Sequence, residues 1–218
     1  MPRRPALDRA RIVAAAVQVA DRDGLAALSM RSLGRELGVE AMSLYHHLRG
    51  KDELLDLLAD WPFSRITLPE AGAPWREAMR ARAASAREVL TAHPWALGLV
   101  ESRPVPGPAM LRHHESVLAC LRGHGFSVRE ALHAFSTIDA YIYGFVLTER
   151  TLPDPAVAAS TGLPTAEDVG IDPQSHPHLA ETFAEVLGRE GFTPAQSFGS
   201  GLAMILDGLA QRLDPPGR

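Results

Sequence analysis

The sequence predicts an all-α protein, with a small three-helix head at the N-terminus and a larger helical domain after it. Apolar residues recur at helical spacing from the start of the chain, beginning with Ile12, Ala16 and Ala20. No stretch alternates apolar and polar residues convincingly with the two-residue period of a half-buried strand, so a sheet is not expected. Prolines stand where several helices should begin: Pro74, Pro94 and Pro108.

Short helices separated by glycines are expected in the first 61 residues. Asp8 and Ser29 carry side chains that can accept hydrogen bonds from the free N–H groups at a helix start. Gly38 is expected to end the second helix in the left-handed conformation, which a side chain disfavours. Pro62 is expected to end the fourth helix. The three helices of the head are expected at residues 8–22, 30–37 and 41–47, and a fourth, at residues 51–61, joins the head to the larger domain.

Longer helices are expected in the rest of the chain. Two capping boxes, Ser127 with Glu130 and Thr193 with Gln196, indicate helix starts, because in this motif the two side chains satisfy each other's backbone donors. Residues 151–177 are rich in proline and are expected to form a long loop. The helices are expected at residues 74–92, 94–101, 108–124, 128–150, 178–190 and 194–212.

Charge is distributed unevenly along the chain. The net charge is -4, but residues 1–51 hold nine basic and five acidic residues, a balance of +4, which leaves -8 for residues 52–218. A basic end on an acidic body is typical of a protein that docks one end on phosphates. The single cysteine, Cys120, excludes an intrachain disulfide, and no apolar run is long enough to span a membrane. We therefore expect a cytoplasmic protein that does not bind membranes.

The pair of short helices around Gly38 and Val39 is typical of a helix-turn-helix, in which the second helix lies in the major groove of DNA. Leu44 and Leu48, one turn apart, are the better candidates for burial. Lys51, at the start of the next helix, is suited to hold a phosphate. The alternative is a helical corner with ordinary surface polarity. The side chains expected to face DNA are those of Ala41, Met42, Ser43, Tyr45, His46 and His47.

Residues 8–63 resemble the DNA-binding domain of the TetR (tetracycline repressor) family. The resemblance is carried by Leu33-Gly-Arg-Glu-Leu-Gly-Val and by Ser43-Leu-Tyr-His-His-Leu-Arg-Gly-Lys. It implies that Arg31 is the first-helix residue directed at DNA and that Tyr45 and Lys51 mostly contact phosphate. The family's namesake carries glutamine, proline and tryptophan where this chain has Ala41, Met42 and His46. The operator is therefore expected to differ in sequence.

The larger domain also resembles the ligand domain of the tetracycline-repressor branch, notably at Trp75, residues 125–132 and residues 141–149. The metal-ligating histidine of that branch aligns near Leu99, and its asparagine and phenylalanine pocket residues align with Arg82 and Ala86. Leucine cannot ligate a metal, so we predict neither a tetracycline ligand nor a magnesium requirement, and no cofactor. If Arg82 points inward it suits a carboxylate, phosphate or phenolate; otherwise it is a solvated surface arginine.

Asp139 lies in an otherwise apolar helix, where a buried carboxylate needs a partner. His113, His114 or Arg82 could supply it, or Asp139 could face solvent or a second subunit. Adjacent histidines on one helix point in different directions, so no metal site is expected. The candidate ligand-binding residues are Arg82, His93, His113, His114, Asp139 and Tyr143, together with Trp95 and Tyr141.

The last helix is rich in small residues, which permit close helix–helix approach. With Ile138, Ile142, Phe145 and Val146 it is expected to form a four-helix dimer interface, unless these residues pack within one chain. The predicted function is that of a homodimeric regulator, most simply a repressor, which binds a near-palindromic double-stranded operator and dissociates when a small-molecule inducer binds.

Three alternatives remain open at this point. An enzyme is disfavoured, because the chain carries neither a G-x-S-x-G nucleophile elbow nor a phosphate-binding glycine loop. A helical sensor that does not bind DNA is the second. An activator is the third, because the sign of regulation depends on where the operator lies.

Overall fold

The computed structural model describes residues 6–70, 72–103, 105–150, 167–187 and 194–213. Contacts divide the chain into two compact units, Met1–Ile142 and Tyr143–Arg218. The described residues are helical with no strand, as predicted. The expected capping box at Thr193 and most of the proline-rich loop lie outside the described residues.

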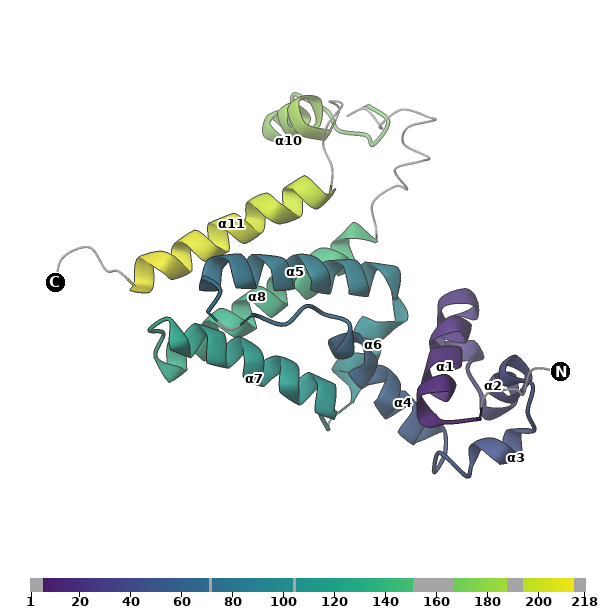
Figure 1. The fold of residues 1–218 in the computed structure, drawn as a ribbon. Helices are drawn as coiled ribbons and strands as arrows, with labels where there is room; N and C mark the ends of the chain where they lie inside the picture. Colours follow the sequence, from purple (N-terminus) through teal and green to yellow (C-terminus); the bar gives the residue numbers. More distant parts are fainter. Residues whose placement is uncertain (1–5, 71, 104, 151–166, 188–193, 214–218) are drawn as a thin grey trace. The chain divides into compact units, whose positions relative to one another are not determined.

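The N-terminal head begins the first unit (Figure 1). Its caps are those the sequence predicts: Asp8 accepts a hydrogen bond from the N–H of Arg11, Ser29 accepts one from Ser32, and Gly38 is left-handed with φ 66° and ψ 38°. The apolar sides of the helices pack into one core, to which Ile12 and Leu33 belong. The elements are α1 (Arg9–Asp23), η1 (Leu25–Ala27), α2 (Met30–Leu37), α3 (Ala41–Leu44), α4 (Lys51–Asp60) and η2 (Trp61–Ser64).

One expected helix end in the head is wrong, and a second is correct to within one residue. The helix expected at residues 41–47 is α-helical only to Leu44, because the N–H groups of Tyr45, His46 and His47 bond three residues back, as in the tighter turns common at helix ends. Pro62 does not stop the helical backbone. The α-helix ends at Asp60, and Pro62 occupies the start of η2, where its missing N–H leaves no bond unmade.

Three further helices and part of a fourth complete the first unit. Pro108 is the first residue of its helix as predicted, whereas Pro74 and Pro94 come one residue before theirs. The capping box between Ser127 and Glu130 is formed, with backbone bonds of 3.2 Å and 2.7 Å. The elements are α5 (Trp75–Ala92), α6 (Trp95–Ser102), α7 (Pro108–Gly123) and α8 (Val128–Glu149), the last of which continues into the second unit.

The second unit holds the end of α8, α10 (Pro177–Thr182), the π-helical turn η3 (Phe183–Leu187) and α11 (Pro194–Leu213). The helix expected at 178–190 therefore changes to π-helical bonding after Thr182. Phe145 and Phe198 pack edge to face within this unit, with ring centroids 5.1 Å apart. Within the described residues, no helix is both long and apolar enough to cross a membrane.

The expected role of α8 in a dimer interface needs a correction. Ile138, Ile142 and Val146 are fully or almost fully buried within the single chain, so the alternative of intrachain packing holds for them. The apolar stripe of α8 is used for the core of the protomer. A second copy could be met only by other faces of the helix.

Candidate DNA-binding surface and ligand site

The turn between α2 and α3 is set by two glycines. Gly38 ends α2 in the left-handed region, and the N–H of Val39 then bonds the carbonyl oxygen of Gly34 at 2.9 Å. A Cβ added at Gly34 would lie 2.9 Å from the carbonyl oxygen of Val39 and 3.2 Å from the backbone nitrogen of Ala41. The helices therefore meet through Gly34, which sequence analysis did not single out although it lies in the recognised Leu-Gly-Arg-Glu-Leu-Gly-Val segment.

The recognition surface is the set of side chains predicted to contact DNA: Arg31, Ala41, Met42, Ser43, Tyr45, His46, His47 and Lys51. Met42 and Tyr45 are 72% and 47% exposed. Arg31, His46 and Lys51 are also exposed, while Ala41, Ser43 and His47 are half-buried. Leu44 and Leu48 are buried as predicted and anchor the segment to the head.

A carboxylate that sequence analysis missed holds the segment after α3 in place. Glu53 of α4 accepts hydrogen bonds from the backbone N–H of Arg49 at 2.6 Å and from the guanidinium of Arg9 at 2.6 Å. Arg9 also donates to the carbonyl oxygen of His47 at 3.0 Å. These bonds, that of the Arg49 N–H above all, lower the pKa of Glu53. Glu53 thus ties α1, α4 and the end of the recognition surface together.

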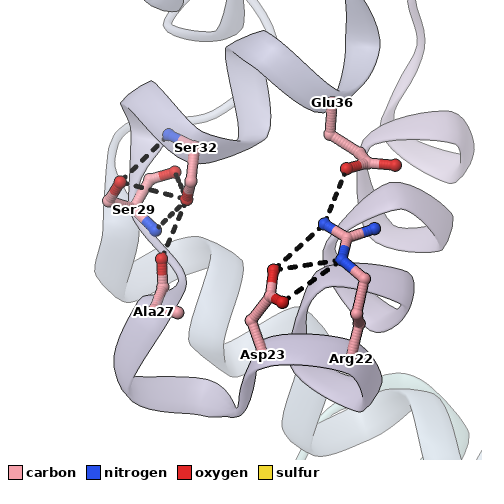
Figure 2. Close-up of polar contacts among 6 residues, drawn as sticks. All are labelled: Arg22, Asp23, Ala27, Ser29, Ser32 and Glu36. Atoms are coloured by element: carbon pink, nitrogen blue, oxygen red, sulfur yellow. Dashed lines mark hydrogen bonds and ion pairs between the residues drawn. The ribbon is translucent and has the colours of Figure 1, made fainter.

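Charged groups also brace α1 against α2 (Figure 2). Arg22 lies between Asp23 and Glu36, with ion pairs of 3.0 Å and 2.9 Å. On the adjoining turn, Ser29 and Ser32 cap each other's backbone N–H groups, and the Ser32 hydroxyl also donates to the carbonyl oxygen of Ala27. The helix that carries Arg31 is therefore fixed at its start and along one side.

A buried polar cluster lies among α5, α7 and α8 of the first unit. Arg82 donates through Nη2 to Asp139 and through Nε to Nε2 of His113, the latter at 3.0 Å. Arg82 and His113 are only 2% and 1% exposed. Asp139 thus has the buried partner that its position required, and the alternative of a solvated Arg82 is wrong. His114 is half-buried beside this cluster, against the ring of Phe135.

The protonation of His113 follows from its partner. A guanidinium can only donate, so Nε2 of His113 must accept, and the ring proton of the neutral imidazole is on Nδ1. Burial, with the nearby Arg82 and His114, lowers the pKa of His113 to about 3, which keeps the ring neutral. Burial also lowers the pKa of His114.

Two donors of the cluster remain unused. Nη1 of Arg82 and Nδ1 of His113 are buried and have no hydrogen-bond partner among the described residues. A buried donor left without a partner costs about 1–3 kcal/mol, so such groups are rare in native proteins and indicate a site for a polar guest.

The remaining ligand candidates lie elsewhere. Nδ1 of His93 pairs with Asp21 of α1 at 2.8 Å, and Trp95 donates to the same Asp21 oxygen at 2.6 Å, so both residues join the head to α6. Tyr143 belongs to the second unit and is half-buried. Leu99, aligned near a metal ligand in the resemblance, is buried in the apolar core of the head. In the described parts of the chain, no three His, Cys, Asp or Glu side chains are grouped as metal ligands.

Both parts of the chain match family models. The model described as "Bacterial regulatory proteins, tetR family" matches residues 12–58, and "Tetracyclin repressor-like, C-terminal domain" matches residues 68–213. The first match contains the whole recognition surface, and the second contains the whole of the buried polar cluster. Proteins of this kind are transcriptional regulators, not enzymes.

Similar proteins carry the same description. An HTH-type transcriptional regulator of Saccharopolyspora erythraea is 39% identical over 83% of this chain and 76% of its own. The HTH-type transcriptional repressor DrrR1 of Streptomyces coeruleorubidus is 34% identical over 94% and 78%. The crystal structure of ActR from Streptomyces coelicolor with actinorhodin superposes with a TM-score of 0.76 at 27% identity, covering 95% of this chain and 99% of that one. The chain therefore belongs to the TetR family of transcriptional regulators.

Proposed function

We propose that the chain is a cytoplasmic homodimeric repressor, which binds a near-palindromic operator through the recognition surface and leaves it when a small-molecule inducer binds the larger domain. The observation that carries the proposal is the exposure of Met42 on α3 and of Tyr45 and His46 in the turn that follows it, in a segment that packs closely on Gly34. Arg31 and Lys51 flank them with positive charge. This combination offers contacts to base edges and to phosphates on one face of the head.

Dimerisation is supported by exposed small residues in the second unit. Gly144 on α8, and Gly199 and Gly208 on α11, are exposed and have nothing within 4 Å of an added Cβ. Leu147 and Met204 are exposed on the same two helices. A second copy packed on these faces would form the two-fold dimer that a near-palindromic operator requires, whose half-sites lie about 34–36 Å apart.

Repression and release are supported by the relatives. DrrR1 is named a repressor, and ActR has been crystallised with actinorhodin. An inducer acts by favouring a dimer whose heads do not fit the operator. To shift the population strongly it must prefer that state by about 5 kcal/mol, because a ligand with equal affinity for both states changes nothing.

The test is a fluorescence-anisotropy titration of the purified protein on DNA from upstream of its own gene, with scrambled DNA as the control, at two salt concentrations. We expect tight binding to the upstream DNA that weakens as salt rises, since phosphate contacts release counterions. Equal affinity for both DNAs, or no binding at either salt concentration, would refute operator binding at this locus.

Matched variants connect binding to the recognition surface. Lys51→Ala should weaken binding on all sequences and make it less dependent on salt, whereas Arg80→Ala, an exposed arginine on α5, should leave it unchanged. Tyr45→Ala should also weaken binding with little change in sequence preference, because Tyr45 is proposed to contact phosphate. A changed preference would show that Tyr45 reads a base.

A further inference from the structure

The buried polar cluster carries no net charge. The guanidinium of Arg82 is neutralised by its ion pair with Asp139, and His113 is held neutral by burial and by the Arg82 cation. A second full negative charge placed here would have no free cation to offset it. Arg82 is already paired with Asp139, so it is not free to select an anionic ligand, contrary to the expectation from the sequence.

What the cluster does offer is donors. Nη1 of Arg82 carries N–H groups, and Nδ1 of His113 carries the imidazole proton, and neither has a partner among the described residues. Asp139, the acceptor of the cluster, already receives the Nη2 hydrogen bond of Arg82. The complement of such a site is an acceptor atom, not a donor or a cation.

Aromatic rings surround these donors. The ring of Phe63 lies 5.3 Å from that of His113, and the ring of Phe135 lies 5.5 Å from the guanidinium carbon of Arg82 and 4.8 Å from the ring of His114. A molecule that reaches the donors would thus contact aromatic faces and edges. These contacts favour a flat or apolar body over a polar one.

We infer that the inducer is an uncharged molecule, at least partly aromatic, with a carbonyl-type oxygen that accepts hydrogen bonds from Arg82 Nη1 or His113 Nδ1. The inference rests on the proposed function, since it names the class of ligand that the regulator senses. It excludes carboxylates of the same shape, because the cluster has no free cation to offset their charge, and ammonium compounds, because the two unpartnered atoms are both donors.

Four naphthalene probes of similar size test this class: 2-acetylnaphthalene, 2-ethylnaphthalene, 2-naphthoate and 2-naphthylmethylammonium. Their dissociation constants for the full-length protein are measured by equilibrium dialysis up to millimolar concentration. The ketone is expected to bind at least fivefold more tightly than each of the other three. A preference for the carboxylate or the ammonium compound, equal binding of all four, or binding of none would overturn the inference.

Variants locate the selectivity in the cluster. His113→Phe and Arg82→Met should each reduce the advantage of the ketone over the hydrocarbon, while Arg80→Met should keep it. Arg82→Met leaves Asp139 unpaired. If that variant does not fold, the double variant Arg82→Met/Asp139→Leu, which removes both charges, is used in its place. An advantage that persists in His113→Phe and in the folded arginine variant would show that the cluster is structural only.

The two proposals fail in distinguishable ways. Operator binding by the wild-type protein is measured without any probe, so its failure refutes the repressor and leaves the selectivity intact. Loss of the ketone preference with operator binding retained refutes only the ligand class.

Discussion

Asp21, near the end of α1, accepts a 2.6 Å hydrogen bond from the indole Nε1 of Trp95 at the start of α6. The same carboxylate oxygen pairs with Nδ1 of His93 at 2.8 Å. Trp61, which follows α4, packs edge to face on His93 with ring centroids 4.6 Å apart. The head is thus joined to the rest of the first unit by contacts of α1 as well as by the chain connection after α4.

Removing this carboxylate should loosen the head. Asp21→Ala is expected to lower the free energy of unfolding by about 1 kcal/mol, less than a fully buried charged hydrogen bond because the site is partly exposed. Trp95→Phe should lower the free energy of unfolding by less, since it removes only one of the two hydrogen bonds to Asp21. Urea denaturation measures both, and the control is Glu115→Ala, which removes an exposed carboxylate of α7. Equal stability of Asp21→Ala and Glu115→Ala would contradict the tether.

Gly34 should not tolerate a side chain, although it lies in a helix. Alanine is preferred over glycine in helices by about 1 kcal/mol, but its Cβ would press on the backbone of Val39 and Ala41, which cannot move without opening the turn. Gly34→Ala is expected to destabilise the protein by about 1–2 kcal/mol and to weaken operator binding. The control is Gly98→Ala on α6, where nothing lies within 4 Å and a gain in stability is expected. A stabilised Gly34→Ala variant would disprove the close approach.

The head and the buried cluster show what a sequence can and cannot specify. The caps at Asp8, Ser29 and Gly38 were predicted because each depends on hydrogen bonds within a few residues. The end of α3 was placed too late, since the preference between α-helical and tighter bonding in its last turn is small. Local pattern thus fixed helix starts better than helix ends.

Long-range partners were harder to predict. Asp139 could be said to need a cationic or donor partner because burial of a lone carboxylate is costly. The choice of Arg82, with His113 on its other donor, needed the packing of α5, α7 and α8. His93 is a ligand candidate in the sequence because it is a polar side chain of the larger domain, but its partner Asp21 lies 72 positions away and belongs to the head. Sequence gives the chemical need, while the fold selects which group meets it.

Asp60 should stabilise α7 from outside that helix. The N-cap of α7 is Gly107, which has no side chain to cap the helix, and the carboxylate of Asp60 accepts instead from the N–H groups of Ala109 and Met110 at 3.0 Å and 2.8 Å. Asp60→Ala should therefore cost about 1–2 kcal/mol in urea denaturation, like the loss of a side-chain cap. Asp60→Asn, which keeps an acceptor, should cost less. If both variants match the wild type, the contact does not stabilise α7.

The neutral state of His113 should make stability depend on pH. Its pKa is about 3 in the folded protein and about 6.5 in the unfolded chain, so between these values the unfolded state binds the additional proton. The stabilisation is fully present above pH 6.5 and is lost as the pH falls, by up to about 2 kcal/mol between pH 7 and pH 5. His113→Phe removes the titrating group, so its free energy of unfolding should fall less steeply with acid than that of the wild type. The free energies of unfolding of the two proteins are compared by urea denaturation at pH 7, 6 and 5. The contributions of the other histidines to the pH dependence largely cancel when one profile is subtracted from the other. Parallel profiles would mean that His113 titrates alike in both states and is not held neutral by burial beside Arg82.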